Sequence, residues 1–244
     1  FDEARLTREL AELEAASAAP DFWKDQQAAQ KVLQRRRKLD EQQRTLEALL
    51  ALVAEWGFPK VQAVVRGGQY AHPKGVFYGG TGPVWSPRWL RGWCADNLGD
   101  AQRVIIIDLH TGLGPWGHGE LIASAAPGEP MFDRAAALWP DAKSMLAGDS
   151  VSATLAGDWL NIADQLAPHA EVTPICIEYG TVDIVTVLQA LRADAWLHAH
   201  GDPTSTESSA IRSQVRKAFA DDDPSWISAC WTRFHDVFKV TQQS

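Results

Sequence analysis

The sequence predicts an α/β domain preceded by an α-helical hairpin, and three observations support this. Leucines recur at helical spacing between residue 1 and about residue 56. Glycine, proline and tryptophan then interrupt the chain repeatedly from Gly57 onward. Two apolar runs follow at 104–110 and 172–177, and runs of this kind are typical of strands buried on both faces near the centre of a sheet. We therefore expect two domains, 1–57 and 58–244.

The composition narrows the classes of function. Of 244 residues, 45% are hydrophobic and 22% are charged, which favours a globular core over disorder. The 23 Lys and Arg residues against 31 Asp and Glu residues give a net charge of −8, so we do not expect nucleic acid as a partner. No run of about 18 apolar residues is present, so we expect no membrane partner. The three cysteines are too far apart for a CxxC site and odd in number, which indicates a reduced, cytoplasmic protein.

The hairpin is expected from two helical patterns separated by a break. The first pattern ends before Pro20, and the second runs from about Asp25 to Trp56. Asp21 is a candidate cap for the second helix. The basic run 35–38 is interpreted as a solvated helix face, with a phosphate or an acidic partner as the alternative. An exposed face rich in Leu and Ala would favour a homo-oligomer formed through the hairpin.

The second part is expected to alternate strands with helices. Five helices are predicted from their apolar spacing and flanking residues. They are 85–98, 152–166, 181–193, 208–219 and 225–238.

Two strands end in side chains that are suited to catalysis. His110 closes the first strand and Glu178 follows the second. In open α/β sheets ligands bind beyond the carboxyl ends of the strands, so both side chains would project toward that crevice. The alternative is structural: a histidine bonded to a backbone carbonyl and a glutamate paired with an arginine.

The segment after His110 is rich in glycine. Gly112, Gly114 and Gly117 match the spacing of a dinucleotide-binding loop, but no helix follows them, so we interpret the segment as a loop that borders a cleft. His118 and Glu120 would share one face of an extended chain. They are candidate auxiliary metal ligands or, alternatively, a hydrogen-bonded loop pair.

Four ordered motifs resemble a known family. They are RGGQYAHPKGVFYGG at 66–80, IDLHTGLG at 107–114, IEYGT at 177–181 and LRADAWLH at 191–198. Residues 60–240 are similar in these motifs to the zinc carboxypeptidase superfamily, in its bacterial DUF2817 branch. The resemblance implies a mixed-sheet carboxypeptidase-like domain and a zinc cofactor. It also implies hydrolysis of a C-terminal amide bond in a peptide or amino-acid conjugate.

The same resemblance assigns roles to particular residues. His110 would be a zinc ligand, and Glu178 would be the general base that acts on zinc-bound water. His118, Glu120, Tyr78 and Tyr179 would line the substrate cleft. The family's upstream His-x-x-Glu pair and its Asn-Arg segment have no counterpart here. Because a catalytic zinc usually needs three protein ligands, we expect an incomplete domain with weak or no catalysis.

Residues 1–56 resemble a different protein class. The segments RLxxEL at 5–10 and APDFWKDQ at 19–26 are similar to the N-terminal helical region of peptide chain release factor 2. The chain therefore looks like a fusion. The alternative to a hydrolase is a non-catalytic scaffold whose hairpin mediates assembly or partner binding.

Overall fold

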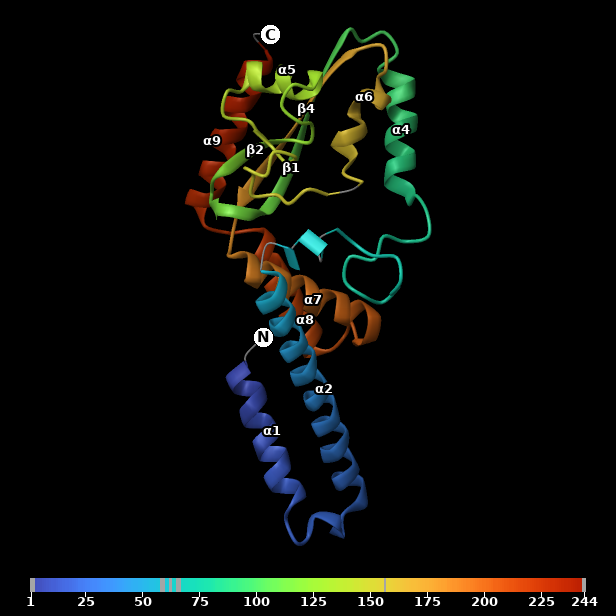
Figure 1. Cartoon of the computed structure of the whole chain (residues 1–244), viewed down its shortest axis with the longest axis vertical. Helices are drawn as coiled ribbons and strands as arrows, with labels where there is room; N and C mark the ends of the chain where they lie inside the picture. The colour runs from blue at the N-terminus through green and yellow to red at the C-terminus, as the bar shows by residue number, and fades with distance from the viewer. Residues whose placement is uncertain (1–2, 58–59, 62, 65–66, 156, 243–244) are drawn as a thin grey trace. The chain divides into compact units, whose positions relative to one another are not determined.

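The computed structural model describes residues 3–57, 60–61, 63–64, 67–155 and 157–242, and its elements are labelled in Figure 1. The fold is mixed α/β, as predicted, with helices at the N-terminus and a four-stranded mixed sheet after them. Contacts divide the chain into two compact units, Phe1–Gln62 and Ala63–Ser244. Within the described residues, no helix combines the length and the apolar character needed to cross a bilayer.

The first unit is the predicted helical hairpin. It contains α1 (Glu3–Ser17), a short 3-10 helix η1 (Phe22–Lys24) and α2 (Gln26–Trp56). Leu6 of α1 is buried, as are Ala29 and Leu39 of α2, which gives the two helices an apolar contact face.

Polar contacts complete the hairpin. Arg35 of α2 pairs with Glu9 of α1 at 2.6 Å, so part of the basic run is neutralised across the hairpin. The expectation that Asp21 caps the second helix is wrong. Asp25 is the N-cap, and its carboxylate accepts a hydrogen bond from Ala28 N at 3.0 Å, because η1 occupies the intervening turn.

The sheet of the second unit has the strand order β1-β4-β2-β3. Its strands are β1 (Arg103–Trp116), β2 (Gly119–Ala123), β3 (Lys143–Ser144) and β4 (Glu171–Gly180). β1 pairs with β4 in parallel, β2 runs antiparallel to β4, and β3 is parallel to β2.

The two predicted strands both form, but only one of them is central. β4 is buried along nearly its whole length and lies between β1 and β2. β1 was expected at the centre of the sheet. It lies instead at an edge of the described sheet, and its apolar residues from Val104 to Ile107 are only half-buried. An apolar run indicates burial but not the order of strands, which long-range pairing determines.

Strand alternation sorts the sheet residues onto two faces. The face that we call the α9 face carries Ile175, Ile177 and Leu121, which pack against α5 (Pro130–Leu138) and α9 (Pro224–Thr241). The opposite face, which we call the α6 face, carries Cys176 and Ile122. These residues pack against Met145 and against the 3-10 helix η2 (Trp159–Ile162), which leads into α6 (Ala163–Leu166). Figure 1 shows α5 and α9 on one side of the sheet and α6 on the other.

Most of the other helices match their predicted ranges. The structure contains α4 (Trp85–Asn97), α7 (Ile184–His200), α8 (Thr206–Phe219) and α9. Side-chain caps explain where three of them begin. Asp183, Ser205 and Asp223 each accept hydrogen bonds from backbone N–H groups of the first turn.

The predicted helix at 152–166 is wrong over its first half. Among the described residues of this range, only the short η2 and α6 form, because tertiary contacts hold the preceding described residues in an irregular path. Val151 N donates to Glu120 at 2.8 Å, and Thr154 Oγ1 donates to the Met145 carbonyl at 3.1 Å. The prediction also missed β2, β3 and α5.

Candidate metal site at the carboxyl ends of β1 and β4

Three of the predicted site residues lie on three neighbouring strands. His110 of β1 pairs with Glu178 of β4, and Glu178 pairs in turn with Glu120 of β2. Residues paired across adjacent strands point to the same face. The structure therefore brings His110 and Glu178 together near the carboxyl end of the regular β1–β4 pairing, on the α6 face.

His110 is oriented by a hydrogen-bonded carboxylate. Its Nε2 lies 2.9 Å from Asp108 Oδ2, and the same oxygen accepts a hydrogen bond from Trp159 Nε1 at 2.8 Å. The hydrogen bond and the charge of Asp108 raise the pKa of His110 above its ordinary value, although partial burial opposes them. With Nε2 occupied, the free ring nitrogen is Nδ1, which lies 3.9 Å from Glu178 Oε2.

Glu178 is buried and is held by the glycine-rich segment. Leu113 N donates to Glu178 Oε1 at 3.0 Å, and the exposed fraction of the Glu178 side chain is only 7%. Gly112 and Gly114, on either side of Leu113, have φ angles of 129° and 96°, a region that glycine reaches at no steric cost.

The same segment crosses the end of β4. A Cβ atom added to Gly180 would collide with the carbonyl oxygens of Gly114 and Pro115. Only glycine at position 180 lets the two backbones approach this closely. The prediction that this segment is a loop is wrong, because its residues up to Trp116 belong to β1. The segment crosses the carboxyl end of β4 and bonds to Glu178.

Cys176 is a third candidate ligand, which sequence reasoning missed. One ligand atom each from His110, Cys176 and Glu178 lies within 4.8 Å of the others. Cys176 precedes Glu178 by two positions on β4, so strand alternation places both on one face, and this is the signal that could have identified it. Burial, with the nearby charge of Glu178, raises the pKa of the Cys176 thiol well above its ordinary value.

Glu120 is engaged in a separate network. Its carboxylate accepts hydrogen bonds from Lys143 Nζ at 2.7 Å, Ser150 Oγ at 3.0 Å and Val151 N at 2.8 Å. Burial by itself would raise the pKa of Glu120, but these bonds, that from Lys143 first, hold it below its ordinary value. Glu120 therefore ties β2 to the irregular segment that covers the α6 face.

The structure does not bring the other predicted cleft residues into this group. Tyr179 follows Glu178 directly, so strand alternation turns its ring to the α9 face, where it is buried in the apolar core. His118 is exposed in the turn between β1 and β2. Tyr78 lies before α4, where it forms an isolated bridge with Gln69.

The comparisons with known proteins identify a family. The family described as "Protein of unknown function (DUF2817)" matches residues 18–233. The chain belongs to the DUF2817 family. The match begins at residue 18, so most of the hairpin lies inside it and the family region is not confined to 60–240 as expected.

The other comparisons add no relatives. Neither the search of curated proteins nor the search of solved structures finds a match. None of the comparisons links this DUF2817 chain to zinc carboxypeptidases or to release factors.

Proposed function

We propose that this DUF2817 chain binds zinc through the His110 group. We further propose that it is a hydrolase of C-terminal amide bonds in peptides or amino-acid conjugates, with weak or no activity. The observation that supports the proposal is the convergence of His110, Cys176 and Glu178 within 4.8 Å near the carboxyl end of the regular β1–β4 pairing.

The donor set suits zinc. Imidazole nitrogen, thiolate sulfur and carboxylate oxygen are the three ligand types that zinc takes from proteins. Bond lengths of roughly 2.0–2.3 Å in tetrahedral geometry separate ligand atoms by about 3.3–3.7 Å. The 3.9 Å between His110 Nδ1 and Glu178 Oε2 is close to that spacing. Asp108 on Nε2 would fix the ring for coordination through Nδ1.

The site could promote hydrolysis in the following way. A bound zinc ion would lower the pKa of a water molecule and polarise the scissile carbonyl. Glu178 would take a proton from that water and pass it to the leaving amine. His110 has a half-exposed side chain, which leaves this side of the group open to a substrate.

The same arrangement explains why we expect little activity. If Glu178 binds the metal as the third ligand, the group contains no further base. If Glu178 remains the base, only His110 and Cys176 hold the metal, one ligand fewer than a catalytic zinc site usually has. The three side chains cannot supply three metal ligands and a separate general base.

Cobalt binding tests the metal site directly. We expect the purified full chain to bind Co²⁺ with a thiolate charge-transfer absorption in the near ultraviolet, and zinc to displace the cobalt. Cys176→Ser should remove the absorption, and His110→Ala should weaken binding. Cys230→Ser is the matched control, because Cys230 is a half-buried thiol on α9, packed against the α9 face of the sheet. Absence of binding, or equal binding by all three variants, would refute the site.

A peptidase assay tests the chemistry separately. We expect little or no hydrolysis of C-terminal peptide substrates with zinc present. Any activity that is seen should be lost with a chelator and in Glu178→Gln. Strong hydrolysis that is lost with a chelator and in Glu178→Gln would contradict the expectation of weak activity. Activity that survives Glu178→Gln would contradict the role of Glu178 as the base.

A second candidate function is a scaffold that assembles through the hairpin. At 1.5 Å per residue, the 31 residues of α2 extend about 46 Å and the 15 of α1 about 22 Å. Beyond the part of α2 that α1 can cover, Leu50, Leu52 and Trp56 are exposed by 51%, 38% and 39%. Apolar side chains along a helix favour pairing with a second copy.

Sedimentation analysis tests the scaffold. We expect a concentration-dependent dimer that Leu50→Glu weakens, while Gln34→Glu, at an exposed polar position of α2, leaves it intact. A monomer at all concentrations, or a dimer unchanged by Leu50→Glu, would exclude assembly through the hairpin.

A further inference from the structure

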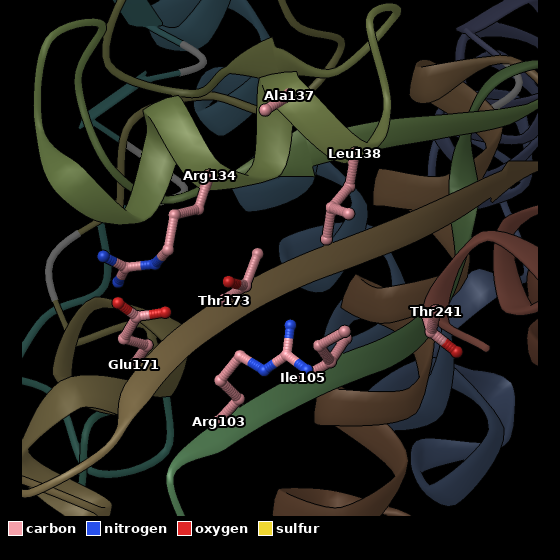
Figure 2. Close-up of a pocket in the computed structure, with 8 residues that line it drawn as sticks. All are labelled: Arg103, Ile105, Arg134, Ala137, Leu138, Glu171, Thr173 and Thr241. Carbon is pink, nitrogen blue, oxygen red and sulfur yellow. The ribbon is translucent and has the colours of Figure 1, made fainter. Parts of the chain in front are cut away.

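An open pocket of about 600 Å³ lies on the α9 face, at the amino ends of β1 and β4 (Figure 2). Sheet residues form its floor, and α5 with the last turn of α9 forms its walls. The lining residues are Arg103, Ile105, Arg134, Ala137, Leu138, Glu171, Thr173 and Thr241. Figure 2 shows Arg134 and Leu138 pointing from α5 toward the sheet.

This pocket is separate from the metal site. Arg103 and His110 are seven residues apart on β1, and at roughly 3.3 Å per residue the two positions lie about 23 Å apart. Strand alternation also puts them on opposite faces of the sheet. A ligand in the pocket would not contact the metal site.

Three charged side chains line the pocket, and Figure 2 shows the Arg134 guanidinium on the same side as the Glu171 carboxylate. In the part of the chain that the structure describes, Arg103, Arg134 and Glu171 form no ion pair. Arg134 donates Nη2 to the Val172 carbonyl, which holds its guanidinium beside β4. Its Nε is buried and has no hydrogen-bond partner. A ligand in the pocket cannot reach this buried nitrogen, but the negative charge of an anionic ligand at this wall would stabilise the guanidinium group as a whole.

We propose that this pocket binds a free α-amino acid with an aliphatic side chain. Arg103 and Arg134 bind its carboxylate, because the guanidinium fork matches the geometry of a carboxylate. Glu171 binds its ammonium group. Ile105 and Leu138 contact the aliphatic side chain.

The mixture of charges selects a zwitterion over a simple ion. A ligand with only a carboxylate would meet repulsion from Glu171, and a ligand with only an ammonium group would meet two guanidinium groups. Thr173 adds a hydroxyl group that can bond to either end of the ligand.

Calorimetry with three related compounds tests the proposal on the full chain. L-leucine carries both charges, 4-methylpentanoate lacks the ammonium group, and L-leucinamide lacks the carboxylate. We expect L-leucine to bind and each of the other two to bind at least about tenfold more weakly, because each loses a charge-assisted contact. No binding of L-leucine, or equal binding of 4-methylpentanoate, would overturn the assignment.

Two variants connect the binding to the pocket. Arg103 and Glu171 are exposed residues at the first positions of their strands, so Arg103→Gln and Glu171→Gln should leave the fold intact. Arg103→Gln should weaken L-leucine binding. Glu171→Gln should weaken L-leucine but not 4-methylpentanoate. Arg212→Gln, at an exposed position on α8, is the control. L-leucine binding that is unchanged in Arg103→Gln would place the ligand elsewhere and refute the proposal.

Discussion

Replacement of Glu120 by glutamine distinguishes a structural role from a role in the metal site. The buried carboxylate has two occupied oxygens: Oε2 accepts from Lys143, and Oε1 accepts from Ser150 and Val151. Glutamine keeps one acceptor oxygen and replaces the other with an amide donor. The rotamer that preserves the bonds to Ser150 and Val151 turns this amide toward the Lys143 ammonium group.

The expected cost follows from that geometry. One hydrogen bond to a charged group is lost, which is worth roughly 1.5–3 kcal/mol. The Lys143 side chain is 42% exposed, so water can solvate its ammonium group and the cost stays within this range. We therefore expect Glu120→Gln to lower the free energy of unfolding by about 2 kcal/mol.

Urea denaturation, followed by tryptophan fluorescence, measures this change. Lys143→Met is the matched variant, because it removes the same contact from the exposed side. The double variant should lose less stability than the sum of the losses in the two single variants, because each single change already breaks the same bond.

The pH dependence provides a second check. The pKa of folded Glu120 lies below its ordinary value of about 4.3. Its stabilising contribution is therefore complete above that value and is lost as the pH falls through the lower folded pKa. The difference between wild type and Glu120→Gln should be constant near neutral pH and should shrink in acid. Unchanged stability together with lost cobalt binding would refute the structural role.

Two further predictions concern the closure over β4 and the orientation of His110. Gly180→Ala should cost about 3 kcal/mol in urea denaturation, because its Cβ would collide with the Pro115 carbonyl oxygen. Gly92→Ala is the comparison, because Gly92 has open space around it in α4, and it should raise the free energy of unfolding by about 0.5–1 kcal/mol. Equal changes in the two variants would contradict the close approach at Gly180. In chelator, the raised pKa of His110 should add stability below about pH 6.5 that is lost as the pH rises through the folded value. Asp108→Asn should reduce this contribution, and a wild type that gained stability over the same rise would contradict the assignment.

Local sequence patterns predicted the helical hairpin, the two long strands and most helix boundaries. Helical spacing, capping residues and β-branched runs act over a few neighbouring residues, so they can be read without knowledge of the fold. The prediction that His110 closes its strand is wrong, because β1 continues to Trp116. His110 and Glu178 lie instead near the end of the regular pairing between β1 and β4. The helix predicted at 152–166 failed because distant partners, Glu120 and Met145, hold its first half in an irregular path.

Tertiary contacts determined the rest of the candidate site. Cys176 is an ordinary apolar strand residue in sequence terms, and only the pairing of β4 with β1 places it beside His110. The same alternation along β4 buries Tyr179 on the opposite face. The sequence indicates which segments are apolar and which tend to form helices or strands. Strand order and register establish which of them meet, because pairing joins segments about seventy residues apart whose partners no local pattern records.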